Sequence, residues 1–104
     1  AQNTTVNGIN VAELFQTIDQ IKQQPFIARF RFRVDNEWID GGHNRTTVKD
    51  FHGAGQEIAH EQKFQLDCDE PRILLGRDRG ANPVEHLLNA LAGCVTSSLV
   101  YQAA

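Results

Sequence analysis

The sequence predicts one α+β domain spanning residues 1–104, and three observations lead to this class. Apolar residues recur at steps of three and four towards both ends of the chain, which is the period of a helix with one buried face. Between these segments, apolar and polar residues alternate at every second position, which is the period of a strand. A length of 104 residues allows one domain with a small core. We therefore expect an antiparallel sheet with a long helix.

The first helix is expected over residues 11–24. Asn10 has a side chain that caps helices, and Glu13 follows it at the spacing of a capping box. Pro25 ends the helix because proline cannot continue the backbone hydrogen bonding. We expect its apolar stripe to pack on the core of the domain or on a second subunit, rather than to act as a separate binding arm. The stripe consists of Val11, Leu14, Phe15, Ile18 and Ile21.

Alternation predicts strands in the middle of the chain. The expected extended stretches are residues 26–34, 37–39, 45–51 and 60–69, with turns at residues 35–36, 40–42 and 52–55. In the first stretch, Arg29, Arg31 and Arg33 alternate with apolar residues. This spacing favours the solvated face of an antiparallel strand over a stripe that binds nucleic acid. Cys68 continues the apolar face of the last strand, which predicts a buried, unreactive thiol.

A charged loop precedes the C-terminal helix. Glu70 and Pro71 are expected to end the sheet, and residues 73–75 to form a short apolar anchor. The segment from Gly76 to Gly80 begins and ends with glycine and leads into a helix, as phosphate-binding loops do. It lacks the Gly-Lys-Ser/Thr ending of those loops, so we interpret it as a connection.

The C-terminal helix has a clear start signal. Asn82 is its cap, Pro83 takes the first helical position, and Glu85 completes a capping box. Its apolar stripe runs through Val84, Leu87, Leu88, Leu91, Val95 and Ser98, and Cys94 lies one helical position from the centre of the stripe. The helix is expected to run to Ala104 without a stop signal. Since the other predicted elements leave its stripe uncovered, we expect the chain to be the first portion of a longer domain.

The composition argues against several classes of partner. The net charge is −3 and basic residues are interspersed with acidic ones, which disfavours nucleic acid or an anionic membrane as the main partner. No run of eighteen apolar residues is present, and residues 1–5 have neither the basic nor the apolar region of a signal peptide. A cytoplasmic protein with free thiols is expected. No metal or other cofactor is predicted, because the histidines lack the spacing of a zinc site: His43, His52, His60 and His86.

The segment from Gly76 to Cys94 resembles the central-helix motif of the OsmC/Ohr family, in which Asn-Pro-x-Glu-x-Leu leads through small residues to a reactive cysteine. The resemblance covers only the first part of the family domain, which continues into further strands and a second helix. It implies an OsmC-like fold, an antiparallel sheet with a long central helix, in an intertwined homodimer. Better-studied members are antioxidant stress proteins that reduce organic hydroperoxides with a cysteine thiolate. In those proteins, a second cysteine resolves the product as a disulfide.

The resemblance implies that Cys94 is the catalytic cysteine, since it stands eleven residues after Pro83 as the motif requires. Glu85 resembles the helix-start glutamate that orients an arginine in the peroxidases. Those proteins have the glutamate directly after the proline, whereas Glu85 stands two residues after it. The difference turns the carboxylate by about 100° around the helix, so helix capping is its alternative role.

The resemblance also implies an arginine from the first hairpin that polarises thiolate and peroxide. Arg45 is our candidate for it, with the alternatives Arg29, Arg31 and Arg33. The substrate is expected to contact His43, Leu87 and Leu91, whose apolar members favour an alkyl or lipid-like hydroperoxide. Cys68 corresponds to no cysteine of the motif.

Two functions from different classes follow. The first is a thiol peroxidase that acts on organic hydroperoxides through Cys94, Arg45 and Glu85. The second is a non-catalytic OsmC-like dimer that binds a small apolar ligand or has a structural role, with Cys94 buried in a seam between helices. A cation within hydrogen-bond distance of the Cys94 sulfur would favour the enzyme, since peroxides are attacked by thiolate.

Overall fold

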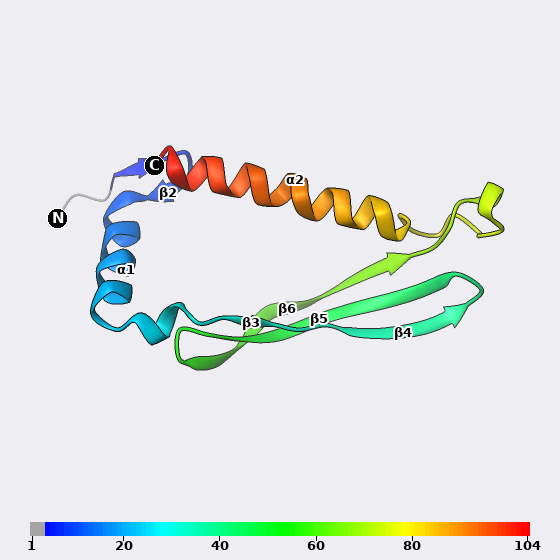
Figure 1. Cartoon of the computed structure of the whole chain (residues 1–104), viewed down its shortest axis with the longest axis horizontal. Helices are drawn as coiled ribbons and strands as arrows, with labels where there is room; N and C mark the ends of the chain where they lie inside the picture. Colours follow the sequence, from blue (N-terminus) through cyan, green and yellow to red (C-terminus); the bar gives the residue numbers. More distant parts are fainter. Residues whose placement is uncertain (1–3) are drawn as a thin grey trace.

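The structure is a computed structural model that describes residues 4–104. Residues 1–3, which belong to the segment compared above with signal peptides, lie outside the described residues. The described chain contains two α-helices, strands and two short 3₁₀ helices, which confirms the predicted α+β class (Figure 1). In chain order they are β1 (Thr5–Val6), β2 (Ile9–Asn10), α1 (Val11–Gln23), η1 (Pro25–Ala28), β3 (Arg31–Phe32), β4 (Asp35–Asp40), β5 (His43–Gly53), β6 (Gln56–Cys68), η2 (Arg72–Leu74) and α2 (Pro83–Gln102).

Strand β5 is the centre of a four-stranded antiparallel sheet. β6 pairs along one edge of β5, and β3 and β4 pair one after the other along the opposite edge. The turn between β5 and β6 consists of Ala54 and Gly55, which both have positive φ angles of 52° and 77°. Two such residues form the tight hairpin turn whose twist matches that of the strands. The β5–β6 hairpin is therefore longer and its turn tighter than the sequence predicted.

The predicted strand over residues 26–34 is mostly wrong. Pro25 starts a 3₁₀ helix that includes Phe26 and Ala28, and β3 is reduced to Arg31 and Phe32. Proline fixes the φ angle that begins a helical turn and lacks the N–H that a strand ladder requires. The period-two pattern of the arginines therefore extends beyond the residues that pair in the sheet.

The predicted turn at Asp35 and Asn36 is also wrong, because both residues pair with β5 as the first residues of β4. The Asn36 side chain donates hydrogen bonds to Asn44 Oδ1 (2.9 Å) and Thr46 Oγ1 (3.1 Å) on the neighbouring strand. These cross-strand partners satisfy an amide that would otherwise favour a turn.

The sheet has two chemically different faces. The apolar face carries pairs of residues that lie opposite each other on neighbouring strands, namely Phe32 with Phe51, Phe64 with Val48, Leu66 with Thr46, and Cys68 with Asn44. Aromatic rings extend along it, with centroid separations of 5.4 Å from Phe32 to Phe51 and 5.1 Å from Phe51 to His60. The opposite, charged face carries two ion-pair clusters, one of Arg33, Asp50 and Glu57 and one of Arg45, Asp67 and His43.

Both helices begin as predicted. The Asn10 side chain accepts a hydrogen bond from the Glu13 amide at the start of α1, and Asn82 and Glu85 form a complete capping box at the start of α2. α1 ends at Gln23 before Pro25, and α2 ends at Gln102 rather than at Ala104. Neither helix of the described chain is long and apolar enough to cross a membrane.

The described chain has no hydrophobic core of its own, since no hydrophobic side chain in it is buried. Its radius of gyration is 18.1 Å, whereas a compact domain of this length has about 13 Å. A loop that contains η2 connects β6 to α2, and α2 runs back along the sheet (Figure 1). Large apolar side chains of both β6 and α2 remain exposed. The predicted anchor at residues 73–75 is wrong, because Leu75 is 96% exposed. A single described chain therefore lacks the buried apolar core that ordinarily stabilises a folded domain.

Candidate functional site

Cys94 lies in the middle of α2 as an exposed, free thiol. Its neighbour Gly93 leaves space beside it, since a side-chain carbon added there would have no atom of another element within 4 Å. The small residues around Cys94 therefore leave the sulfur accessible in a single chain.

The two sides of α2 face different surroundings. His86 lies against the sheet and makes a hydrogen bond of 3.0 Å to the Asp67 carbonyl oxygen. The Nε2 of His86 is the donor, since a carbonyl oxygen can only accept. Val95 follows nine residues later, which is about two and a half helical turns, and so points to the opposite side of α2. The apolar stripe is therefore turned away from the part of the sheet that α2 contacts.

Glu85 is occupied at the start of the helix. Its Oε1 accepts a hydrogen bond from the Asn82 amide (3.0 Å), and its own amide donates to Asn82 Oδ1 (2.9 Å). Cys94 lies nine residues further along, which is about 13 Å in an α-helix. The structure thus places Glu85 in its alternative role as a helix cap and does not bring it to Cys94.

Arg45 and His43 lie together on the charged face. Arg45 donates from Nε to Asp67 Oδ1 (2.6 Å) and from Nη2 to Asp67 Oδ2 (3.2 Å). His43, 8% exposed, places Nε2 3.4 Å from Asp67 Oδ2. Asn44 and the residue opposite it, Cys68, lie on the other face, next to α2. Within one chain, the sheet therefore separates Arg45 and His43 from α2 and its cysteine.

The other predicted substrate contacts, Leu87 and Leu91, are exposed on the stripe of α2. Leu91 stands about one turn before Cys94 and Leu87 about two turns before it, so they share one side of the helix with the thiol. The structure therefore brings Cys94 together with Leu87 and Leu91, and brings Arg45 together with His43, but does not join the two groups.

Asp67 joins the cluster of Arg45 and His43, and sequence reasoning missed it. The hydrogen bonds from Arg45 lower the pKa of the Asp67 carboxyl, partial burial opposes this, and the contact with His43 lowers it further. Its alternating position in β6 marked it only as a solvated residue. The cross-strand pairing of Asp67 with Arg45 depends on the register of β5 and β6, which no local pattern reveals.

We expect the Asp67–Arg45 pair to stabilise the protein above about pH 4 and to lose this effect in acid. Because the pKa of Asp67 is lower in the folded protein, its contribution is complete above the unfolded-state pKa and disappears as the pH falls through the folded-state pKa. In urea titrations from pH 7 to pH 2.5, Asp67→Asn should show a smaller loss of stability in acid than the unmodified protein. Asp19→Asn on exposed α1 is the control, and equal pH profiles for both variants would contradict the expectation.

Cys68 is partly exposed where the apolar face meets the start of α2. It borders a pocket of about 350 Å³ lined by Asn44, Thr46, Leu66, Cys68, Pro83 and His86. Cys94 lies eight residues beyond His86, about 12 Å along the helix, whereas a disulfide needs Cα atoms within about 7 Å. Cys68 therefore cannot resolve an oxidised Cys94 within one chain of this conformation.

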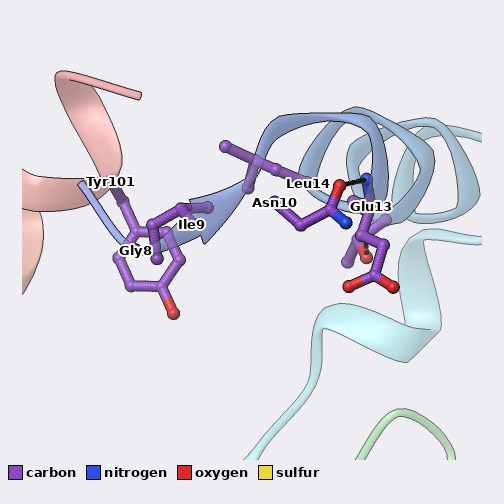
Figure 2. Close-up of a pocket in the computed structure, with 7 residues that line it drawn as sticks. Gly8, Ile9, Asn10, Glu13, Leu14 and Tyr101 are labelled. Carbon is purple, nitrogen blue, oxygen red and sulfur yellow. Dashed lines mark hydrogen bonds between the residues drawn. The ribbon is translucent and has the colours of Figure 1, made fainter. Parts of the chain in front are cut away.

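A second pocket of about 350 Å³ lies where the two ends of the described chain meet (Figure 2). Figure 2 shows the Tyr101 ring beside Gly8 and Ile9, and the hydrogen bond from the Glu13 amide to Asn10 Oδ1. This pocket is lined by Gly8, Ile9, Asn10, Glu13, Leu14, Thr17 and Tyr101. Its lining holds neither thiol nor cation, so the candidate reactive group remains Cys94.

Among the described residues, no three His, Cys, Asp or Glu side chains are close enough together to hold a metal ion. The candidate site thus consists of a thiol and apolar side chains on α2, whereas the predicted cation, Arg45, lies on the face of the sheet away from α2. No model of a known protein family matches this chain, and no curated protein matches it either.

Proposed function

We propose that this chain is an OsmC-like stress protein that forms an intertwined homodimer and reduces organic hydroperoxides through Cys94. The observation that carries the proposal is an accessible thiol in the middle of a long helix, among small residues and beside an exposed apolar stripe. The resemblance of the segment from Asn82 to Cys94 to the family motif adds the chemistry, and the helix that carries it begins with a complete capping box.

The absence of a core among residues 4–104 supports the dimer. Both the apolar face of the sheet and the stripe of α2 are exposed, although a stable protein must remove such surfaces from water. A second copy offers the same two surfaces and can cover them in a closed, two-fold arrangement. It would also enclose Cys94 in an apolar site, which favours alkyl hydroperoxides over hydrogen peroxide.

The proposed reaction begins with the Cys94 thiolate. Its sulfur attacks the outer oxygen of the hydroperoxide, the O–O bond breaks, and the alkoxide takes a proton and leaves as an alcohol. The cysteine is thereby oxidised to a sulfenic acid, and an external thiol reduces it by forming a mixed disulfide and releasing water. The thiolate needs a cation, and the charged face carries one in Arg45. Because the sheet separates Arg45 from α2 of its own chain, the second copy would have to supply it.

The test is the rate at which cumene hydroperoxide oxidises Cys94, read as loss of free thiol between pH 5 and pH 9. We expect a fast reaction that persists below about pH 8.5, the ordinary pKa of a cysteine, and that vanishes in Cys94→Ser. Cys68→Ser is the matched control and should keep the rate. Oxidation of Cys94 no faster than that of glutathione, or only after unfolding, would contradict the proposal.

A non-catalytic OsmC-like dimer is the second candidate, and one observation favours it. Arg45 donates hydrogen bonds from Nε and Nη2 to Asp67, and both residues lie on the face of the sheet away from α2. If assembly leaves that arrangement intact and brings no other cation to the sulfur, Cys94 becomes a packing residue in an apolar seam. Arg45→Gln separates the two candidates, since it slows oxidation of Cys94 only if the guanidinium acts on the thiolate.

A further inference from the structure

The loop between β6 and α2 is held in one conformation by a buried carboxylate. Asp69 is 1% exposed and accepts hydrogen bonds from the amides of Glu70 (2.7 Å), Arg77 (3.3 Å) and Arg79 (3.2 Å). Asp78, between the two arginines, has a positive φ of 58°. The hydrogen bonds to Asp69 therefore hold the backbone of the loop in place at Arg77 and Arg79.

The two glycines of this loop permit its tight course. A side-chain carbon at Gly76 would lie 1.8 Å from the Glu70 carbonyl oxygen, and one at Gly80 would lie 2.3 Å from the Asp67 carbonyl oxygen. No side chain fits at either position, so the spacing of the glycines reflects close backbone packing. The loop does not bind phosphate with its amides, because the Asp69 carboxylate already occupies those donors.

The fixed loop directs two arginines into a pocket on the charged face. This pocket of about 410 Å³ is lined by Glu37, Ile39, Asp40, His43, Arg45, Arg77 and Arg79. Three arginines, one from β5 and two from the loop, thus line this pocket together with two carboxylate residues. Asp67 binds one edge of Arg45 from outside this lining.

These guanidinium groups retain free donors. Arg45 uses Nε and Nη2 for Asp67, which leaves the Nη1 edge of its planar group unoccupied. Arg77 pairs only with Asp40 (Nη1 to Oδ2, 3.0 Å), and both side chains are more than half exposed. Within residues 4–104, Arg79 has no carboxylate at ion-pair distance. An exposed pair such as Arg77–Asp40 costs little to exchange for another partner.

We propose that this pocket binds the carboxylate of a small organic monoanion between Arg45, Arg77 and Arg79, with its short apolar chain against Ile39. A planar carboxylate matches the fork of donors that each guanidinium presents. A phosphate dianion fits less well, because Glu37 and Asp40 line the same pocket and Asp67 binds Arg45 from outside it, so three carboxylates already oppose the three arginines. The site shares Arg45 with the reaction proposed for Cys94, whereas Arg77 and Arg79 take no part in that reaction, so a variant of Arg79 tests the site separately.

The test is a titration of the ¹⁵N-labelled full chain with sodium butyrate, followed by the backbone amide signals of residues 77–79 and the Arg Nε–H signals. Equal concentrations of sodium chloride and of butanol control for ionic strength and for the apolar chain. We expect saturable shifts with butyrate, weaker binding of inorganic phosphate and no saturable shifts with either control. Arg79→Gln should raise the Kd of butyrate by about tenfold or more, since hydrogen bonds to charged groups are the strong ones.

Two further variants sharpen the test. Asp40→Asn should lower the Kd of butyrate, because it frees Arg77 and removes a competing carboxylate. Arg31→Gln removes an equal charge at the other end of β5, opposite His52, and should leave the Kd unchanged. Shifts that do not saturate, or an equal Kd in Arg79→Gln, would overturn the proposal, and so would tighter binding of phosphate. If saturating butyrate splits the dimer in sedimentation experiments, the pocket holds a carboxylate of a second copy instead, which also overturns it.

Discussion

Leu91→Asp is expected to abolish the folded dimer and, with it, most of the structure of the chain. Leu91 is 56% exposed in one copy, yet it lies at the middle of the α2 stripe that we expect a second copy to cover. Burying its side chain stabilises the assembly by about 1.5–3 kcal/mol, and burying an unpaired carboxylate there instead costs several kcal/mol. Since no hydrophobic side chain of the described chain is buried, a monomer has no core of its own that could keep it folded.

The measurement combines sedimentation velocity with circular dichroism at several protein concentrations. The unmodified protein should sediment as a dimer, and its Tm should rise with concentration because folding and association are linked. Leu91→Asp should lose both the dimer and the cooperative transition. Asn89→Asp is the matched control, since it adds the same charge two residues away on the other side of α2. A Leu91→Asp monomer with an unchanged, concentration-independent Tm would contradict the expectation.

The starts of the two helices were the most predictable part of the fold. Asn10 and Asn82 signal their helices through local hydrogen bonds to the residues that follow, and those bonds form in the structure. Such signals depend on only a few neighbouring residues. The same holds for the tight turn at Ala54 and Gly55, where glycine provides a backbone conformation that other residues avoid.

Strand boundaries were less predictable because they depend on distant partners. Alternation extends through Phe26 and Val34, but only Arg31 and Phe32 find a pairing position beside β5. Asp35 and Asn36 have the composition of a turn, yet the length of β5 leaves room for them to pair. Tertiary pairing thus overrides local preference at both places.

The candidate site likewise has one part that local sequence predicts and another part that depends on tertiary structure. The helix motif predicted the position of Cys94 on α2, and Leu87 and Leu91 lie on the same helix by simple periodicity. The position of Arg45 relative to Cys94 depends on which face of β5 each residue occupies and on how α2 crosses the sheet. Neither is fixed by local sequence.

The buried position of Asp69 was also not predicted from the sequence. Replacing Asp69 is expected to have a large effect on stability. Asp69→Asn should lower the Tm by on the order of 10 °C, because it puts an amide donor among three backbone amides that need an acceptor. Burial raises the pKa of Asp69, but the three backbone amides together outweigh it and hold the pKa below its usual value. The carboxylate is therefore ionised at neutral pH and completes the hydrogen bonding of the loop.

The lowered pKa of Asp69 determines how its contribution to stability depends on pH. Asp69 contributes stability that is complete above the unfolded-state pKa of about 3.9 and is lost as the pH falls through the lower folded-state pKa. Thermal unfolding at pH 7 and pH 3 should therefore show a smaller difference in Tm for Asp69→Asn than for the unmodified protein. Asp78→Asn, at an exposed position whose positive φ asparagine accepts readily, is the control and should keep the Tm. Equal Tm values for Asp69→Asn and Asp78→Asn would mean that water, rather than Asp69, satisfies the loop amides.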